Sequence, residues 1–160
     1  MASSASSLER REHLARMLDA LQPRRTKPLF VKLPPPGDDP TDVLALARTA
    51  VDGGAAGLTC FNTLPVPEPR LSTGRGGLSG PPLTHGTVDG VREIRRQVGP
   101  TVAINACGGV TTASDVLACL EAGATTVQVY TAFIYEGPRL VRSIAEGLTG
   151  ALRVPHARLA

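Results

Sequence analysis

Short apolar runs and longer segments with helical spacing alternate along the chain. Four runs rich in apolar and β-branched residues predict strands at about residues 29–33, 56–62, 101–106 and 126–131. Each run is followed by a turn that contains Gly or Pro and then by a segment with the apolar spacing of a helix. Strands that alternate with helices in this way pair in parallel. The pattern therefore predicts an α/β fold, either a doubly wound sheet or part of a (β/α)₈ barrel.

Helices are expected where apolar residues recur every three or four positions and where Gly or Pro follows. An amphipathic helix from Leu8 to Leu21 comes first, and Pro23 ends it. Further helices are expected from Asp39-Pro40 to Val51, over residues 87–98, over residues 112–122, and from Gly137-Pro138 to about Leu152. Residues 64–84 are rich in Pro and Gly and are expected to form a long loop.

The predicted elements make up one domain of residues 8–152. Residues 1–7 are small and polar, so a disordered tail is expected there, and residues 153–160 are expected to form a second tail. A length of 160 residues suits one domain and is too short for two domains of ordinary size. The 42% hydrophobic and 19% charged content is that of an ordinary globular protein.

Charge and cysteine content narrow the possible functions. The net charge of +3 comes from basic residues up to Lys32, and the chain has neither long arginine runs nor interleaved aromatic residues, which argues against nucleic-acid binding. Three cysteines without CxxC spacing and three scattered histidines argue against a disulfide framework and against a metal site. The sequence shows no signal peptide and no apolar run of membrane-spanning length. Together these features predict a cytoplasmic protein without a metal.

Polar residues stand at the carboxyl ends of the predicted strands. Lys32, Asn62, Asn105 and Tyr130-Thr131 occupy these positions, where barrel enzymes carry their functional residues. Lys32 is one of two lysines among 17 Lys and Arg residues, so it is either a solvated strand end or a point charge with a chemical task. The amide of an asparagine both donates and accepts hydrogen bonds, which suits a planar ligand.

Two glycine-rich segments follow strands. Gly108-Gly109 forms either a plain tight turn or a cradle in which backbone N–H groups and the next helix N-terminus hold a phosphate, and its late position in the repeat favours the phosphate. The segment 74–80 is either a flexible linker or a loop that lies along a cofactor. It lacks the GxGxxG spacing of a dinucleotide-binding fold.

An ordered set of motifs resembles the C-terminal half of the dihydroorotate dehydrogenase family, over about residues 8–150. The stretches Val127-Gln128-Val129-Tyr130-Thr131 and Tyr135-Glu136-Gly137-Pro138 are similar to the quinone-dependent class 2 enzymes rather than to class 1. The other motifs that carry the resemblance are Phe30-Val31-Lys32-Leu33, Asn62-Thr63, the Gly76-Gly77-Leu78-Ser79-Gly80-Pro81-Pro82-Leu83 segment, and Cys107-Gly108-Gly109-Val110.

The resemblance implies a flavoprotein barrel that oxidises dihydroorotate to orotate with FMN in pyrimidine biosynthesis and passes electrons to a quinone. It implies that Lys32 lies beside the flavin ring and that Asn62 and Thr63 hydrogen-bond to the orotate. It further implies contacts to FMN and its phosphate from Ser79, Gly80, Gly108, Gly109, Tyr130 and Thr131. The expected location is cytoplasmic, with peripheral attachment to the inner membrane in the intact family enzyme.

The chain departs from the family pattern at several positions. Phe61 stands where the family usually has Thr, Ala106-Cys107 replaces a Gly-Val type pair, and Pro34-Pro35-Pro36 lengthens or stiffens the loop after Lys32. In the class 2 family the catalytic base is a Ser within an Asn-x-Ser-Ser-Pro-Asn motif of the preceding half, and this sequence contains no such motif. No catalytic residue is therefore assigned, and the chain alone is expected to be inactive.

Three interpretations stay open at this point. The chain is a fragment that needs its N-terminal half, or a half-barrel that pairs with a second copy and binds FMN or phosphate without full catalysis, or an inactive structural relic. The open strand edges of an isolated half-barrel invite pairing with another chain, which favours the second interpretation over a stable monomer.

Overall fold

The computed structural model describes residues 7–37 and 40–153 of the chain. The tails expected at 1–7 and 153–160 lie outside the described residues except for Ser7 and Arg153, which are the first residue of α1 and the last residue of α6, and Asp39, the expected helix cap, also lies outside them. The helices are α1 (Ser7–Leu21), α2 (Pro40–Asp52), α3 (Thr84–Val98), α4 (Ala113–Glu121), α5 (Thr131–Glu136) and α6 (Arg139–Arg153), with short 3₁₀ turns at Gln22–Arg24 and Pro81–Leu83. The strands are β1 (Phe30–Leu33), β2 (Gly57–Cys60), β3 (Leu64–Pro67), β4 (Arg75–Leu78), β5 (Ala103–Cys107) and β6 (Thr126–Gln128).

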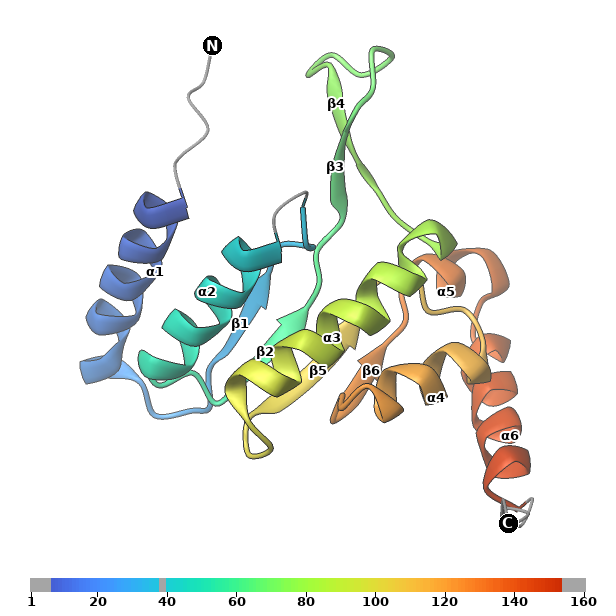
Figure 1. Cartoon of the computed structure of the whole chain (residues 1–160). Coiled ribbons are helices and arrows are strands. Elements are labelled where there is room, and N and C mark those ends of the chain that lie inside the picture. The colour runs from blue at the N-terminus through green and yellow to red at the C-terminus, as the bar shows by residue number, and fades with distance from the viewer. Residues whose placement is uncertain (1–6, 38–39, 154–160) are drawn as a thin grey trace.

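The four predicted strands form one sheet in the order β1-β2-β5-β6, and their parallel pairing confirms the prediction. The last strand is shorter than the expected 126–131, because it ends at Gln128 and Thr131 already begins α5. Helices α2, α3 and α4 lie side by side over one face of this sheet, and α1 packs on the outer side of α2 (Figure 1). Helices on one face are typical of the wall of a (β/α)₈ barrel, whereas a doubly wound sheet carries helices on both faces. The described strands make an open wall rather than a closed barrel.

The two faces of the sheet differ sharply in polarity. Because side chains alternate along a strand, residues in register lie on the same face. One such row consists of Lys32, Thr59, Asn105 and Thr126, which are register partners across all four strands. The alternate residues Leu33, Leu58, Cys60, Ile104 and Ala106 are buried against apolar residues of α2 and α3. The helix-covered face is thus the core, and the opposite face presents a polar row.

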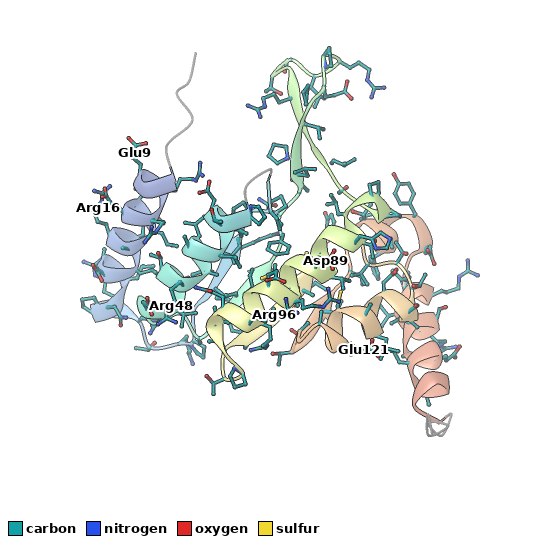
Figure 2. All side chains as sticks on the ribbon, in the orientation of Figure 1. Glu9, Arg16, Arg48, Asp89, Arg96 and Glu121 are labelled. Atoms are coloured by element: carbon teal, nitrogen blue, oxygen red, sulfur yellow. The ribbon has the colours of Figure 1, made fainter. Side chains whose placement is uncertain are left out.

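The outer surface of the helices is charged. Arg48 of α2, Asp89 and Arg96 of α3 and Glu121 of α4 are exposed and point away from the sheet (Figure 2). No helix among the described residues has the length and apolar character needed to cross a membrane.

Arg95 fixes the end of the sheet at which the strands begin. Its guanidinium donates hydrogen bonds to the carbonyl oxygens of Gly99 (2.6 Å), Val102 (2.8 Å) and Gly123 (2.8 and 2.9 Å). These carbonyls belong to the turns that precede β5 and β6, so one side chain of α3 ties both strand entries to the helix layer.

A hairpin and a short helix were missed by the sequence analysis. The expected loop at 64–84 contains an antiparallel hairpin of β3 and β4, which projects from the body of the molecule, and α3 begins at Thr84 rather than at 87 (Figure 1). Pro65 and Pro67 within β3 hide this strand, because proline lowers strand propensity and is tolerated at a ribbon edge. The other missed element, α5, is a six-residue helix that fits between Tyr130 and Gly137.

Phe61 packs against α3 where that helix carries Gly90. The Phe61 side chain is buried, and a Cβ built on Gly90 would lie 2.6 Å from two carbons of the Phe61 ring and 3.1 Å from Cγ of Pro36. Gly90 therefore lets the ring, the helix and the loop after β1 approach closely.

We predict that Gly90→Ala lowers the stability of the protein. Alanine is favoured over glycine in a helix by about 1 kcal/mol, but the clash with the buried Phe61 ring outweighs this gain, and we expect a net loss of about 1–3 kcal/mol. Gly86→Ala in the same helix is the matched control, since a Cβ there has no neighbour within 4 Å. Chemical denaturation measures both variants, and equal or higher stability of Gly90→Ala would refute this packing.

Candidate functional site

A cavity of about 180 Å³ opens where the parallel strands end. All nine residues that the sequence analysis assigned as cofactor or substrate contacts line it, although they come from β1 and from the segments that follow β2, β5 and β6. They are Lys32, Asn62, Thr63, Ser79, Gly80, Gly108, Gly109, Tyr130 and Thr131. The carboxyl ends of parallel strands share one edge of the sheet, and this brings seven of the residues together. Ser79 and Gly80 reach the same edge because the hairpin of β3 and β4 returns the chain to it.

Backbone hydrogen bonds hold the residues after β2 in place. The N–H of Asn62 donates to the carbonyl oxygen of Leu33 at 3.0 Å, and the N–H of Phe61 donates to the carbonyl oxygen of Cys107. These bonds connect the end of β2 to the ends of β1 and β5. Asn62 and Thr63 stay exposed toward the cavity, between Lys32 on one side and the glycine turn on the other.

The turn at Gly108-Gly109 is packed tightly against α3. Both residues have positive φ, of 140° and 76°, and a Cβ on Gly109 would lie 2.5 Å from the backbone nitrogen of Thr84 and 2.9 Å from the carbonyl oxygen of Gly80. The Thr84 hydroxyl donates to the carbonyl oxygen of Gly109 at 2.8 Å. The glycines are thus required by the contact between protein segments, whatever ligand the turn binds.

Side chains of the chain itself cap the N-terminus of α4. Thr112 and Asp115 form a capping box, and Oδ2 of Asp115 accepts from the N–H of Thr111 (3.0 Å), the Thr111 hydroxyl (2.9 Å) and the N–H of Thr112 (2.9 Å). A carboxylate of the chain itself therefore takes the N–H groups of Thr111 and Thr112, which precede the first residue of α4. That the glycine turn and the start of α4 hold a phosphate stays a prediction.

Several lining residues were not predicted. The cavity is also bordered by Phe61, Leu83, Cys107, Val110 and Gln128. Gln128 lies in register with Cys107 on the polar face, so the alternation along 126–130 could have identified it. Phe61 and Leu83 are placed by packing on α3, for which the sequence gives no local signal. Asn105, expected at a strand end, lies within β5, where its Oδ1 accepts from the Thr126 hydroxyl at 3.1 Å.

The three cysteine thiols differ in their surroundings. Burial raises the pKa of Cys60 to about 12 and that of Cys119 to about 11, so both stay protonated near neutral pH. A protonated, buried thiol is a poor nucleophile. Cys60 and Cys119 therefore serve the core, while Cys107 is the cysteine that borders the cavity.

The donors around the cavity suit a flavin with a phosphate tail. They comprise one ammonium group, two side-chain amides, hydroxyls of Thr63, Ser79 and Thr131, and the backbone of the glycine turn. The volume is below the roughly 300–1,000 Å³ of pockets that enclose a whole cofactor. The described residues thus fit one side of such a molecule rather than its entire surface.

Comparison with known proteins gives a consistent result. A family model described as "Dihydroorotate dehydrogenase" matches residues 3–152. A curated "Dihydroorotate dehydrogenase (quinone)" of Leifsonia xyli subsp. xyli is 43% identical over an alignment of 157 residues that covers 91% of this chain and 44% of the relative. The protein of the same description from Streptomyces coelicolor is 41% identical over 144 residues, covering 85% of this chain and 39% of the relative.

Solved structures show the same relationship. The crystal structure of DHODH in complex with ferulenol from Eimeria tenella superposes with a TM-score of 0.76 at 30% identity, covering 89% of this chain and 44% of that one. The ligand-free type from the same organism also gives a TM-score of 0.76, at 31% identity. The chain therefore spans less than half the length of these relatives.

We predict that Asp115 makes the stability of the protein depend on acid pH. Although partial burial alone would raise its pKa, the hydrogen bonds from Thr111 and Thr112 hold the pKa of Asp115 below the ordinary carboxyl value of about 3.9. Its folded-state pKa is thus lower than its unfolded-state pKa. The stabilisation is present in full above about pH 4 and is lost as the pH falls through the folded-state pKa.

The test compares the wild type with Asp115→Asn by denaturation at pH 7 and between pH 4.5 and 2.5. We expect Asp115→Asn to cost about 1 kcal/mol at pH 7, as for other lost caps, and the difference to shrink below pH 4. Glu121→Gln, at the other end of α4, is the control and should cost nothing at pH 7. A difference that stays constant to pH 2.5 would contradict the role of the carboxylate.

Proposed function

The chain belongs to the dihydroorotate dehydrogenase family, and from this premise we propose that it supplies the flavin-binding and orotate-binding residues of a barrel that oxidises dihydroorotate to orotate. The observation that carries the proposal is the convergence of the nine predicted ligand contacts on one cavity at the carboxyl ends of the strands. In barrel enzymes this face carries the active site.

The cofactor in this proposal is FMN, which would lie along the cavity with its ring beside Lys32. Its phosphate would reach the turn at Gly108-Gly109 and the start of α5 at Thr131, with Ser79-Gly80 between ring and phosphate. Lys32 is a slim cation on the polar sheet face. A cation near the ring stabilises the negative charge that a flavin gains on reduction.

Bound FMN supplies the acceptor for a hydride from dihydroorotate. The residues of this chain bind and orient the substrate: the Asn62 amide can both donate to and accept from the edge of the pyrimidine, and the Thr63 hydroxyl is a second partner. In this proposal the base that removes the proton belongs to a segment outside this sequence, as the family resemblance implies. A quinone acceptor and peripheral attachment to a membrane belong to the proposal for the whole barrel, since the relatives are described as quinone enzymes.

A second candidate is a non-catalytic half-barrel that binds FMN or phosphate and assembles with a second copy. The polar row on the sheet face opposite α2–α4, with β1 and β6 as the outer strands of the described sheet, favours it. Sedimentation of the 160-residue chain separates the candidates. A stable dimer favours the half-barrel, and a monomer that dimerises at no tested concentration favours the barrel contributor.

We predict that the positive charge of Lys32 raises the reduction potential of bound FMN. Lys32→Ala should lower the two-electron reduction potential of bound FMN by roughly 20–40 mV, which corresponds to about 1–2 kcal/mol, because the charge of the reduced ring loses its partner. The affinity for oxidised FMN should fall by less than about fivefold, since the phosphate contacts remain.

Lys27, the other lysine of the chain, is exposed near the opposite end of β1 and provides the matched control Lys27→Ala. Fluorescence titration and potentiometry measure the affinity and the potential. Failure of the wild type to bind FMN, or equal potentials for the two lysine variants, would overturn the proposed arrangement.

A further inference from the structure

A proposed ligand contact lies next to each strand of the β3–β4 hairpin, at the open end of the hairpin. Thr63, a proposed orotate contact, directly precedes β3, and Ser79, a proposed flavin contact, directly follows β4. The register pairs Leu64 with Leu78, so Thr63 and Ser79 stand opposite each other at the base of the ribbon. Both residues line the cavity, while the rest of the ribbon projects away from the body (Figure 1).

Thr63 rests directly on the backbone of β4 at Gly77. A Cβ built on Gly77 would lie 2.4 Å from Oγ1 of Thr63 and 2.9 Å from its Cβ. The φ of Gly77 lies outside the left-handed region, so an alanine could adopt its backbone conformation. The absence of a side chain at Gly77 is therefore required by the space that Thr63 occupies.

A Cβ at the neighbouring Gly76 would meet a flexible side chain instead of Thr63. A Cβ on Gly76 would lie 3.2 Å from Cδ1 of Leu71, the end of an exposed and flexible side chain. Gly76 faces the opposite side of the ribbon, because alternate residues of a strand point to opposite faces. The chain thus offers two adjacent glycines in one strand, of which one contacts Thr63.

Contacts that do not involve Gly77 hold the residues that follow β4 in place. The N–H of Leu83 donates to the carbonyl oxygen of Gly80 at 3.0 Å, and the same carbonyl lies against Gly109. Before β3, the N–H of Asn62 donates a hydrogen bond to the carbonyl oxygen of Leu33. A change at Gly77 therefore moves the Thr63 side chain first and leaves Ser79 and Gly80 in place.

We infer that Gly77 is a positioning residue for substrate binding, because it lets the Thr63 side chain lie against β4 and so fixes its hydroxyl opposite Ser79. Gly77 does not itself line the cavity. The inference rests on the proposed function for the role of Thr63, while the packing of Thr63 on Gly77 stands on the structure alone. It predicts that the hairpin base sets the position of the substrate relative to the flavin.

The test uses the full chain with Gly77→Ala and with the matched variant Gly76→Ala. FMN is titrated first, and orotate is then added to the flavin-loaded protein while the flavin absorbance spectrum is followed. We expect Gly77→Ala to weaken orotate binding on the order of 10-fold, the factor expected when a ligand loses one hydrogen bond, and to leave FMN affinity within about twofold. Gly76→Ala should leave both affinities within about twofold of the wild type.

A ligand-free measurement decides the packing separately. In the ¹³C-methyl spectrum of the wild type, the Thr63 methyl group should show a nuclear Overhauser effect to the Hα protons of Gly77, and its resonance should move in Gly77→Ala far more than in Gly76→Ala. Thermal melting of both variants checks that they fold.

The outcomes are distinguishable. A wild type that binds no FMN contradicts the proposed function, and the methyl spectra then still decide the Gly77–Thr63 contact. A wild type that binds FMN and orotate, with equal orotate affinity in Gly77→Ala, overturns the inference and leaves the proposed function standing. An absent Overhauser effect between Thr63 and Gly77 in the wild type also overturns it.

Discussion

The placement of the apolar core on one face of the sheet and of the polar row on the other is the constraint on which the rest of the molecule depends. Leu58 and Ile104 are buried against the helices, while their strand neighbours Thr59 and Asn105 join the polar row on the other face. With the helices on one side, polar side chains such as Lys32 project into the space that the opposite face and the strand ends border. The cavity is therefore a consequence of the one-sided core rather than an addition to it.

Close backbone approaches give this cavity its shape, and each occurs at a glycine. Gly90 admits the Phe61 ring, Gly109 admits the backbone of Thr84, and Gly77 admits the side chain of Thr63. In all three places a Cβ would fall closer than 3.0 Å to a neighbouring atom. These three glycines thus serve contacts between segments, and at Gly109 the glycine also serves a turn with positive φ.

The sequence alone is sufficient for the parallel strands and for the convergence of residues such as Lys32 and Gly108, because strand periodicity and the shared carboxyl edge are local and topological rules. It was not sufficient for the hairpin, since Pro65 and Pro67 mask β3 and its stability comes from pairing with β4. The capping of α4 by Asp115 was not predicted, although the spacing of Thr112 and Asp115 is that of a capping box. The burial of Phe61 depends on Gly90, which is distant in sequence, and no local pattern encodes such a contact.

The central claim, that the cavity holds FMN with its phosphate at the glycine turn, is tested most directly by backbone amide resonances. FMN and riboflavin, which lacks the phosphate, are titrated separately into ¹⁵N-labelled protein. The account predicts that FMN shifts the amides of Gly108, Gly109 and Thr131 most strongly, that riboflavin leaves these three amides almost unchanged, and that both ligands shift residues around Lys32. Equal shifts of Gly109 with both ligands, or shifts confined to residues outside the cavity, would contradict it.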